Sequence, residues 1–300
     1  MKSELIWSKA LETSRKAIEC SAVIPLETFK YKPVKRTFDY ELRFLKRTFP
    51  KKLVEYGPKM NPFTPWDRRL EVQSVNDSFT LILNKYPVQL GHLLLISNYW
   101  KPQNGWLNID DFEAISKVDD DTTGLWFFNS SKEAGASQPH RHFQLLRRQT
   151  YESICPRYDW FCSLLNRELF NSDIKQCVSI KPRKNNLDSN AKDLFNSYKS
   201  MIVDMELGDI NNDDKPLKPY NLLITEKWIS LILRSKDRSH GFSINALGFA
   251  GYFLGTKRSD IEMLIKFGPE SILKEVIYTI KKLFFNFLHL KRLIQSALLA

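Results

Sequence analysis

Two histidines and one glutamine occupy alternate positions of a short segment. His140, His142 and Gln144 are separated by Arg141 and Phe143. Because successive side chains of a β-strand point to opposite faces, a strand here would align all three on one face, along about 13 Å. Imidazole and amide groups in such a row can bond the oxygens of a phosphate chain. The alternative is a coincidental His-x-His pair on a surface or in a metal site.

A stretch of small residues lies immediately upstream of these histidines. Gly135, Ala136 and Ser137 have little side chain to block a ligand, so their backbone N–H groups could form an anion-binding nest. A neutral imidazole attacks phosphorus well and forms a phosphoramidate that a second nucleophile can resolve. Its other ring nitrogen must be held by an acceptor, and donors must surround the phosphoryl oxygens. His142, flanked by His140 and Gln144 and facing Ser137, meets these requirements.

The segment from Asn129 to Gln144 closely resembles the active-site signature of the diadenosine tetraphosphate phosphorylases, also called ATP adenylyltransferases. These enzymes belong to the histidine-triad superfamily, in the branch with galactose-1-phosphate uridylyltransferase, where Gln replaces the third His. The resemblance runs in order from about Leu5 to Val276. Its other landmarks are Asn61-Pro62-Phe63, Leu83-Asn84-Lys85, Val88, Gly91-His92-Leu93-Leu94, Gln103, Leu107, Asp111, Tyr220-Asn221-Leu222-Leu223, Trp228 and the segment 243–251.

This resemblance implies an activity and a site. The reaction would be phosphorolysis of diadenosine tetraphosphate to ADP and ATP, and its reverse, through a covalent AMP–histidine intermediate on His142. His140 and Gln144 would complete the catalytic set. Mg²⁺ would be carried with the polyphosphate, and the partners would be diadenosine polyphosphate, ATP, ADP and inorganic phosphate. Nucleotide and phosphate contacts are implied for Lys51, Asn84, Lys85, Asn129, Gly135, Ala136, Ser137, Gln138, Asn245, Ala246, Leu247 and Tyr252.

Three positions depart from the family pattern. Ser131 stands where the family usually has Gly, and Phe128 stands where it usually has Tyr. Some relatives carry Lys at the position of Thr256, whereas here the lysine follows at Lys257. Ser131 adds a side chain to the loop that enters the site, and Phe128 removes the hydroxyl of the usual Tyr.

The elements that must position these residues follow from periodicity. Short β-type runs cluster in each half of the chain, helix patterns lie at the edges, and no βαβ rhythm is present, which predicts an α+β fold. The resemblance implies a more specific fold, namely a histidine-triad-like antiparallel sheet with flanking helices, plus a C-terminal α+β part that completes the site. We expect strands over 79–85, 92–96, 125–129, 140–146, 220–225 and 229–233, helices over 5–24, 110–118, 259–265 and 269–290, and a polar connector over 175–190.

The expected division is a catalytic domain over 1–174, a C-terminal ATP adenylyltransferase domain over 191–276, and a terminal helix over 277–300.

The chain has 300 residues, of which 43% are hydrophobic and 26% charged, so disordered and fibrous classes are excluded. Cys20, Cys155, Cys162 and Cys177 show no zinc-ligand spacing, and we predict reduced thiols and no structural zinc. The longest nearly uncharged stretch, 242–256, is about 15 residues and too short to span a bilayer. With no secretory signal at the N-terminus, we expect a cytoplasmic protein.

The net charge is +11, and one segment concentrates it. The stretch from Lys30 to Lys52 carries nine Lys or Arg against two acids. It forms either a solvated basic face or a surface that attracts a polyanion, which by the resemblance would be the polyphosphate near Lys51. Three other functions stay open: a hexose-1-phosphate uridylyltransferase, a non-catalytic nucleotide sensor, and a nucleic-acid-binding protein that uses this stretch.

Overall fold

The chain was studied as a computed structural model that describes residues 2–31, 40–47, 61, 63–147, 151–168, 172–183 and 190–278. Its centre is an eight-stranded sheet in which every neighbouring pair of strands is antiparallel. The α+β class with a large antiparallel sheet is thereby confirmed. In order across the sheet, the strands are β3 (Glu71–Asn76), β4 (Phe79–Leu83), β5 (Leu93–Ser97), β7 (His142–Leu146), β6 (Leu125–Asn129), β9 (Tyr220–Ile224), β10 (Trp228–Leu233) and β8 (Val178–Pro182).

Strands from the two halves of the chain join in the middle of this sheet. Strand β6 pairs with β9 in a register that sets Trp126 opposite Ile224 and Asn129 opposite Asn221. One sheet therefore runs across both segments that were expected as separate domains. The boundaries expected at residues 174 and 191 stay a prediction.

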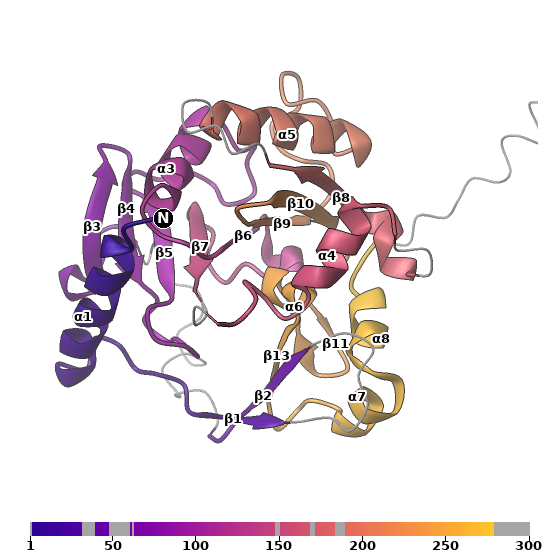
Figure 1. Ribbon diagram of the computed structural model, residues 1–300, viewed down its shortest axis with the longest axis horizontal. Coiled ribbons are helices and arrows are strands. Elements are labelled where there is room, and N and C mark those ends of the chain that lie inside the picture. The colour runs from indigo at the N-terminus through magenta and orange to yellow at the C-terminus, as the bar shows by residue number, and fades with distance from the viewer. Residues whose placement is uncertain are drawn as a thin grey trace, which may run out of the picture.

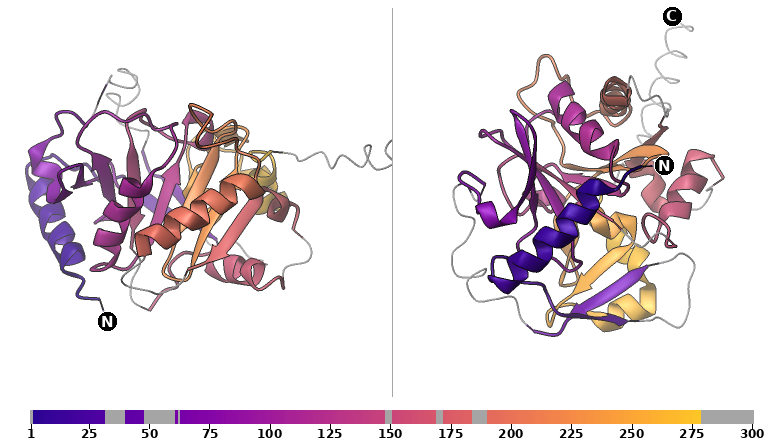
Figure 2. Two further views of the ribbon diagram at one scale, coloured as in Figure 1. Left: turned by 90° about the horizontal axis from the view of Figure 1, so that it is seen from above. Right: turned by 60° about the vertical axis from the view of Figure 1, so that its left-hand side comes forward.

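Helices cover the sheet, and a smaller sheet lies beside it (Figure 1). Helix α1 (Leu5–Glu19) packs on β3, and α3 (Ile109–Asp119) packs on α5 (Asn190–Asp204), which contacts β8 and β10. Helix α4 (Tyr158–Leu165) contacts β8, and the short α6 (Ala246–Ala250) contacts β6 and β9. Figure 2 shows α5 lying along the sheet next to α3.

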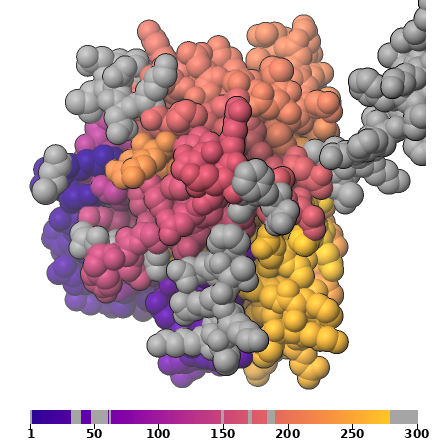
Figure 3. All heavy atoms as spheres, turned by 45° about the vertical axis from the view of Figure 1, so that its right-hand side comes forward, coloured from indigo at the N-terminus to yellow at the C-terminus, as the bar shows by residue number. Residues whose placement is uncertain are grey.

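The smaller sheet has three strands, β1 (Thr28–Tyr31), β2 (Glu41–Leu45) and β13 (Tyr252–Gly255). Strand β13 runs parallel to β2, which joins the C-terminal part to the N-terminal part a second time. Figure 3 shows these two parts side by side, in violet and yellow. The remaining elements are the hairpin β11 (Arg238–Ser239) and β12 (Phe242–Ser243), the helices α7 (Ile261–Phe267) and α8 (Pro269–Lys274), and the 3-10 turns η1 (Arg68–Leu70), η2 (Lys132–Ala134) and η3 (Asp173–Cys177).

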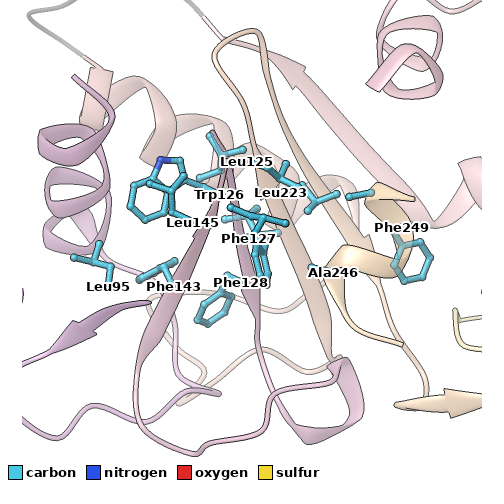
Figure 4. Close-up of a cluster of buried hydrophobic side chains, with 14 of the residues drawn as sticks. Leu95, Leu125, Trp126, Phe127, Phe128, Phe143, Leu145, Leu223, Ala246 and Phe249 are labelled. Carbon is cyan, nitrogen blue, oxygen red and sulfur yellow. The ribbon is translucent and has the colours of Figure 1, made fainter. Parts of the chain in front are cut away.

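The two faces of the large sheet carry different side chains. Trp126 and Phe128 point toward α3 and α5, where Trp126 Nε1 donates to Asp119 and the Phe128 ring lies 4.9 Å from the ring of Phe143 at a tilt of 31°. Alternation turns Phe127 and Asn129 to the opposite face, which α6 covers through Ala246. Figure 4 shows Leu95, Phe143 and Leu145 on the other side of β6 and β7 from Phe249 of α6. One face thus belongs to the core under α3 and α5, and the other is free to build a site.

Most of the expected elements are present, but four details were wrong. The connector expected over 175–190 instead supplies β8, an edge strand on which Pro182 needs no ladder partner for its missing N–H. Helix α5 was not expected, although Leu194, Tyr198, Met201 and Ile202 give it a buried stripe. The helix expected over 269–290 ends at Lys274, because buried Ile277 instead forms a β-bridge with Arg234. Residues 279–300 lie outside the described part of the chain.

The fourth detail concerns the motif itself. Strand β7 begins at His142, and His140 forms an isolated bridge with Pro102. The two histidines still share a face, because the ring of Phe63 lies 5.5 Å from the ring of each.

Candidate active site

His142 is buried at the start of β7 and has a defined tautomer. Its Nδ1 lies 2.8 Å from the backbone carbonyl oxygen of His140. Because a carbonyl oxygen only accepts, Nδ1 carries the proton and donates it, which leaves the lone pair on Nε2. Burial lowers the pKa of His142 to about 4, and the contact with the His140 carbonyl only partly offsets this. The ring is therefore neutral at neutral pH and presents an unprotonated Nε2.

The side chain of Gln103 fixes the backbone around this histidine. The paired residues of β6 and β7 end at Phe127 and Gln144, so Asn129 and His142 lie beyond the last rung. Between them, Gln103 Oε1 accepts from His142 N–H at 2.8 Å, and Gln103 Nε2 donates to the carbonyls of Asn129 at 2.8 Å and His142 at 3.2 Å. A buried amide thus replaces one rung of the ladder and holds the two strand ends at a set separation.

His140 is enclosed, and both of its ring nitrogens lie against oxygen atoms. Nδ1 is 2.8 Å from Asn61 Oδ1, and Nε2 is 2.8 Å from the backbone carbonyl oxygen of Ser97 and 2.9 Å from its hydroxyl. Because the Ser97 carbonyl oxygen only accepts, Nε2 carries a proton and donates it there. Burial lowers the pKa of His140. His140 contacts His142 through its backbone carbonyl oxygen, which accepts from His142 Nδ1.

A relay of three side chains sets the position of Gln144. Gln144 Oε1 accepts from His92 Nε2 at 3.0 Å, and Asn84 Nδ2 donates to His92 Nδ1 at 3.1 Å. Burial lowers the pKa of His92 to about 4, so this ring also stays neutral. His92 thus links Asn84 to Gln144 by hydrogen bonds on both of its ring nitrogens. Asn84 therefore reaches Gln144 only through His92, which lies between them. Lys85 is exposed, and its Nζ lies 5.9 Å from the ring of Tyr86.

The Gly135 turn packs against the C-terminal half of the chain. Gly135 has φ +90°, and a Cβ added there would lie 2.6 Å from Asn245 Cβ and 2.8 Å from the carbonyl oxygen of Ile244. Only glycine satisfies both the left-handed backbone and this close approach. The turn therefore brings the residues before His140 next to the segment that begins at Asn245.

The nest expected at Gly135 and Ala136 is not available to a ligand. Gly135 N–H donates to the carbonyl of Lys132, and Ala136 N–H donates to that of Ser131, because the turn closes on itself. For Ser137 and Gln138, no backbone N–H bond is found among the residues that the structure places. The anion contact expected of this loop thus depends on Ser137 and Gln138, and it stays a prediction.

Asn129, Asn245 and Ala246 come together as expected, but mostly through bonds to one another. Asn129 Oδ1 accepts from Ala246 N–H at 2.9 Å, and Asn245 Oδ1 caps α6 by accepting from Leu247 N–H at 2.9 Å. Tyr252 lies on β13 in the smaller sheet. Lys51 and most of the basic stretch from Lys30 to Lys52 lie outside the described residues.

The two departures from the family pattern have clear surroundings. Phe128 is fully buried between Phe143 and Tyr220, on the face away from His142. Ser131 adopts an extended backbone, and its hydroxyl donates to Glu133 at 2.7 Å. The sequence did not mark Gln103, Ser97, Asn221 or Arg234 as site residues, since their roles depend on contacts between distant segments.

Two negative findings concern the described ranges alone. Within them, no three His, Cys, Asp or Glu side chains gather so that they could hold a metal ion. In the same ranges, none of the helices has the length and apolar character needed to cross a bilayer.

Comparison with known proteins gives matches over nearly the whole chain. Residues 1–155 match the family model of the Ap4A phosphorylase N-terminal domain, and residues 168–279 match that of the ATP adenylyltransferase C-terminal domain. Diadenosine 5',5'''-P1,P4-tetraphosphate phosphorylase 2 of Saccharomyces cerevisiae is 29% identical over 231 residues, which cover 68% of this chain and 71% of that protein. Protein APA1 of the same organism is 27% identical over 216 residues, covering 66% and 67%.

Solved structures share the fold. The crystal structure of yeast Ap4A phosphorylase Apa2 in complex with AMP has a TM-score of 0.72 and 24% identity, and covers 94% of this chain and 100% of that chain. The complex of Apa2 with Ap4A has a TM-score of 0.68 and 23% identity, with coverages of 93% and 99%.

Proposed function

Because this chain belongs to the Ap4A phosphorylase family, we propose that it cleaves diadenosine tetraphosphate with inorganic phosphate to give ADP and ATP, and also runs the reverse reaction. The observation that carries this proposal is the tautomer of His142. Its Nδ1–H is held by the His140 carbonyl, so Nε2 offers a lone pair at neutral pH. The uridylyltransferase alternative is not proposed, since both matched family models belong to the adenylyl-transfer enzymes.

The reaction would proceed in two balanced steps. In the first, His142 Nε2 attacks the α-phosphorus of one adenylyl group, an N–P bond forms, the P–O bond to the bridging oxygen breaks, and ATP leaves. In the second, an oxygen of inorganic phosphate attacks the same phosphorus, the N–P bond breaks, and ADP forms. The His140 carbonyl stabilises the Nδ1 proton throughout, because the ring becomes more positive while it carries the adenylyl group.

Other groups would bind the substrate and spread its charge. Gln144, held by His92, and the amide of Asn129 lie on the same sheet face as His142 and would donate to phosphate oxygens. Mg²⁺ would arrive with the polyphosphate, because its preferred oxygen ligands are those of the phosphates and water. A cytoplasmic location also stays a prediction, which cell fractionation would test.

Incubation with radiolabelled diadenosine tetraphosphate in the absence of phosphate tests this function. We expect the wild type to retain an acid-labile, base-stable adenylyl label, and added phosphate to release it as ADP. His142→Ala should fold and take up no label, while His240→Ala, in an exposed turn beside Glu275, should label fully. A nucleotide sensor would bind the dinucleotide without labelling, and full turnover by His142→Ala would refute the covalent route.

A further inference from the structure

A buried arginine lies behind the Gly135 turn. Arg234 follows β10, is fully buried, and directs its five N–H groups at five oxygen atoms. The acceptors are the carbonyls of Val276 (3.1 Å), Ala134 (3.2 Å), Lys236 (2.7 Å) and Ile244 (2.8 Å), and Asn221 Oδ1 (2.5 Å). This guanidinium therefore ties the end of the turn to three segments of the C-terminal half.

None of these five acceptors carries a charge. Within the described ranges, no carboxylate lies within ion-pair distance of Arg234, and neighbouring Asp237 instead pairs with Arg238 at 2.8 Å. Burial lowers the pKa of Arg234 to about 9, with Asp237 acting weakly in the opposite direction, so the group is still protonated at neutral pH. A buried cation without a counter-charge is unfavourable, which calls for an anion nearby or a function.

The donor-only chemistry of this arginine fixes the orientation of two amides in turn. Because Arg234 can only donate, the oxygen of Asn221 faces it, and Asn221 Nδ2 must point the other way. That Nδ2 donates to Asn129 Oδ1 at 2.8 Å and to the Ala134 carbonyl at 2.8 Å. Asn129 Oδ1 also accepts from Ala246 N–H, so both contacts to this oxygen come from donors.

The remaining end of the Asn129 amide is its NH₂ group. For this Nδ2, no bond to any other residue that the structure describes is found. Asn129 lies across the strand ends from His142, since Gln103 bonds both of their carbonyls. A flipped Asn129 amide would instead present an oxygen atom to a phosphate, and would repel it.

We propose that Arg234 and Asn221 are positioning residues for adenylyl transfer: they hold the Asn129 amide with its NH₂ toward the phosphate chain and place a buried positive charge behind the Gly135 turn. This inference rests on the proposed function. On this proposal, the negative charge of the bound polyphosphate is the counter-charge that Arg234 lacks within the described part of the protein.

Substitution of Asn221 by Asp separates this role from a structural one. In Asn221→Asp, an oxygen still faces Arg234 and now supplies the missing counter-charge, while the bond to the Ala134 carbonyl is lost, so we expect a folded variant with a lowered melting temperature. The second carboxylate oxygen faces Asn129 Oδ1, which forces that amide to turn its oxygen toward the substrate. We expect KM for diadenosine tetraphosphate to rise, and AMP affinity to fall, by about tenfold or more, the effect of losing a hydrogen bond to a charged group.

Asn76→Asp is the charge control, because Asn76, the last residue of β3, uses its Oδ1 to accept from Ser78 and Phe79 N–H at the turn into β4. It should leave KM unchanged. If Asn221→Asp does not fold, Asn129→Asp provides the test. It keeps the oxygen that accepts from Asn221 and Ala246, replaces the NH₂ by a second oxygen, and should show the same loss of AMP affinity. Wild-type affinity in a folded Asn221→Asp or Asn129→Asp would overturn the proposal. An inactive wild type would instead refute the proposed function.

Discussion

The amide of Gln103 offers the sharpest test of how the strand ends are held. Gln103→Leu keeps a similar side-chain volume and removes three buried hydrogen bonds, two to His142 and one to Asn129. At about 1 kcal/mol for each bond, the free energy of unfolding should fall by about 3 kcal/mol. The unpaired N–H of His142 and carbonyl of Asn129 raise this toward about 5 kcal/mol.

The effect on catalysis should be larger than the effect on folding. Without the bridging amide, His142 can move relative to Asn129, and a displacement of about 1 Å from the reactive geometry lowers a rate on the order of 100-fold. We expect kcat for phosphorolysis to fall by that factor at a temperature at which the variant is fully folded. Circular dichroism melts would give the stability, and initial rates of ADP and ATP release would give kcat.

The exposed neighbour provides the control. Asn104→Leu makes the same chemical change one residue away, on the surface, and should alter neither quantity. Gln103→Glu keeps an acceptor for His142 N–H but sets a carboxylate against two carbonyls, so it should resemble Gln103→Leu. A folded Gln103→Leu with wild-type kcat would show that the strand ends hold their separation without this amide.

The remaining predictions concern pH and the Gly135 turn. Burial lowers the pKa values of His92 and His142 from 6.5 to about 4, so between these pH values the unfolded chain binds protons that the folded chain does not. The free energy of unfolding should therefore fall between pH 6.5 and 4, by up to about 3 kcal/mol for each histidine, and urea titrations that give equal values at pH 7 and 4.5 would contradict this. The acid limb of kcat/KM should lie well below pH 6.5, because the nucleophile stays unprotonated; a half-maximal rate near pH 6.5 would contradict the assignment. Gly135→Ala should lose stability and activity together in melts and initial rates, because its Cβ would lie 2.6 Å from Asn245 Cβ on a left-handed backbone.

The sequence predicted those parts of the fold that depend on local pattern. The apolar runs expected as strands over 79–85 and 125–129 are β4 and β6. Edge strand β8 was missed because its alternation is short and flanked by polar residues, and periodicity cannot tell such a strand from a connector. The end of α8 was missed because tertiary packing of Val276 and Ile277 overrides a continuous helical pattern.

The site could be predicted as far as its motif extends. His142 and Gln144 could be assigned from spacing and resemblance, whereas the partners that set their tautomers and orientations could not. His92 and Gln144 are 52 positions apart, and Arg234 and Ala134 are 100 apart. The expected amide nest failed for a local reason, since the carbonyls of Ser131 and Lys132 already occupy the N–H groups of Ala136 and Gly135.

The pairing of β6 with β9 has a consequence for how such a protein can change over evolution. The junction between the two matched segments includes a row of backbone hydrogen bonds, which are indifferent to side-chain identity. Neither segment possesses a finished sheet, so a gene that encoded only one of them would leave an unsatisfied strand edge in the middle of the molecule. Either segment alone would therefore need another way to cover or pair that edge.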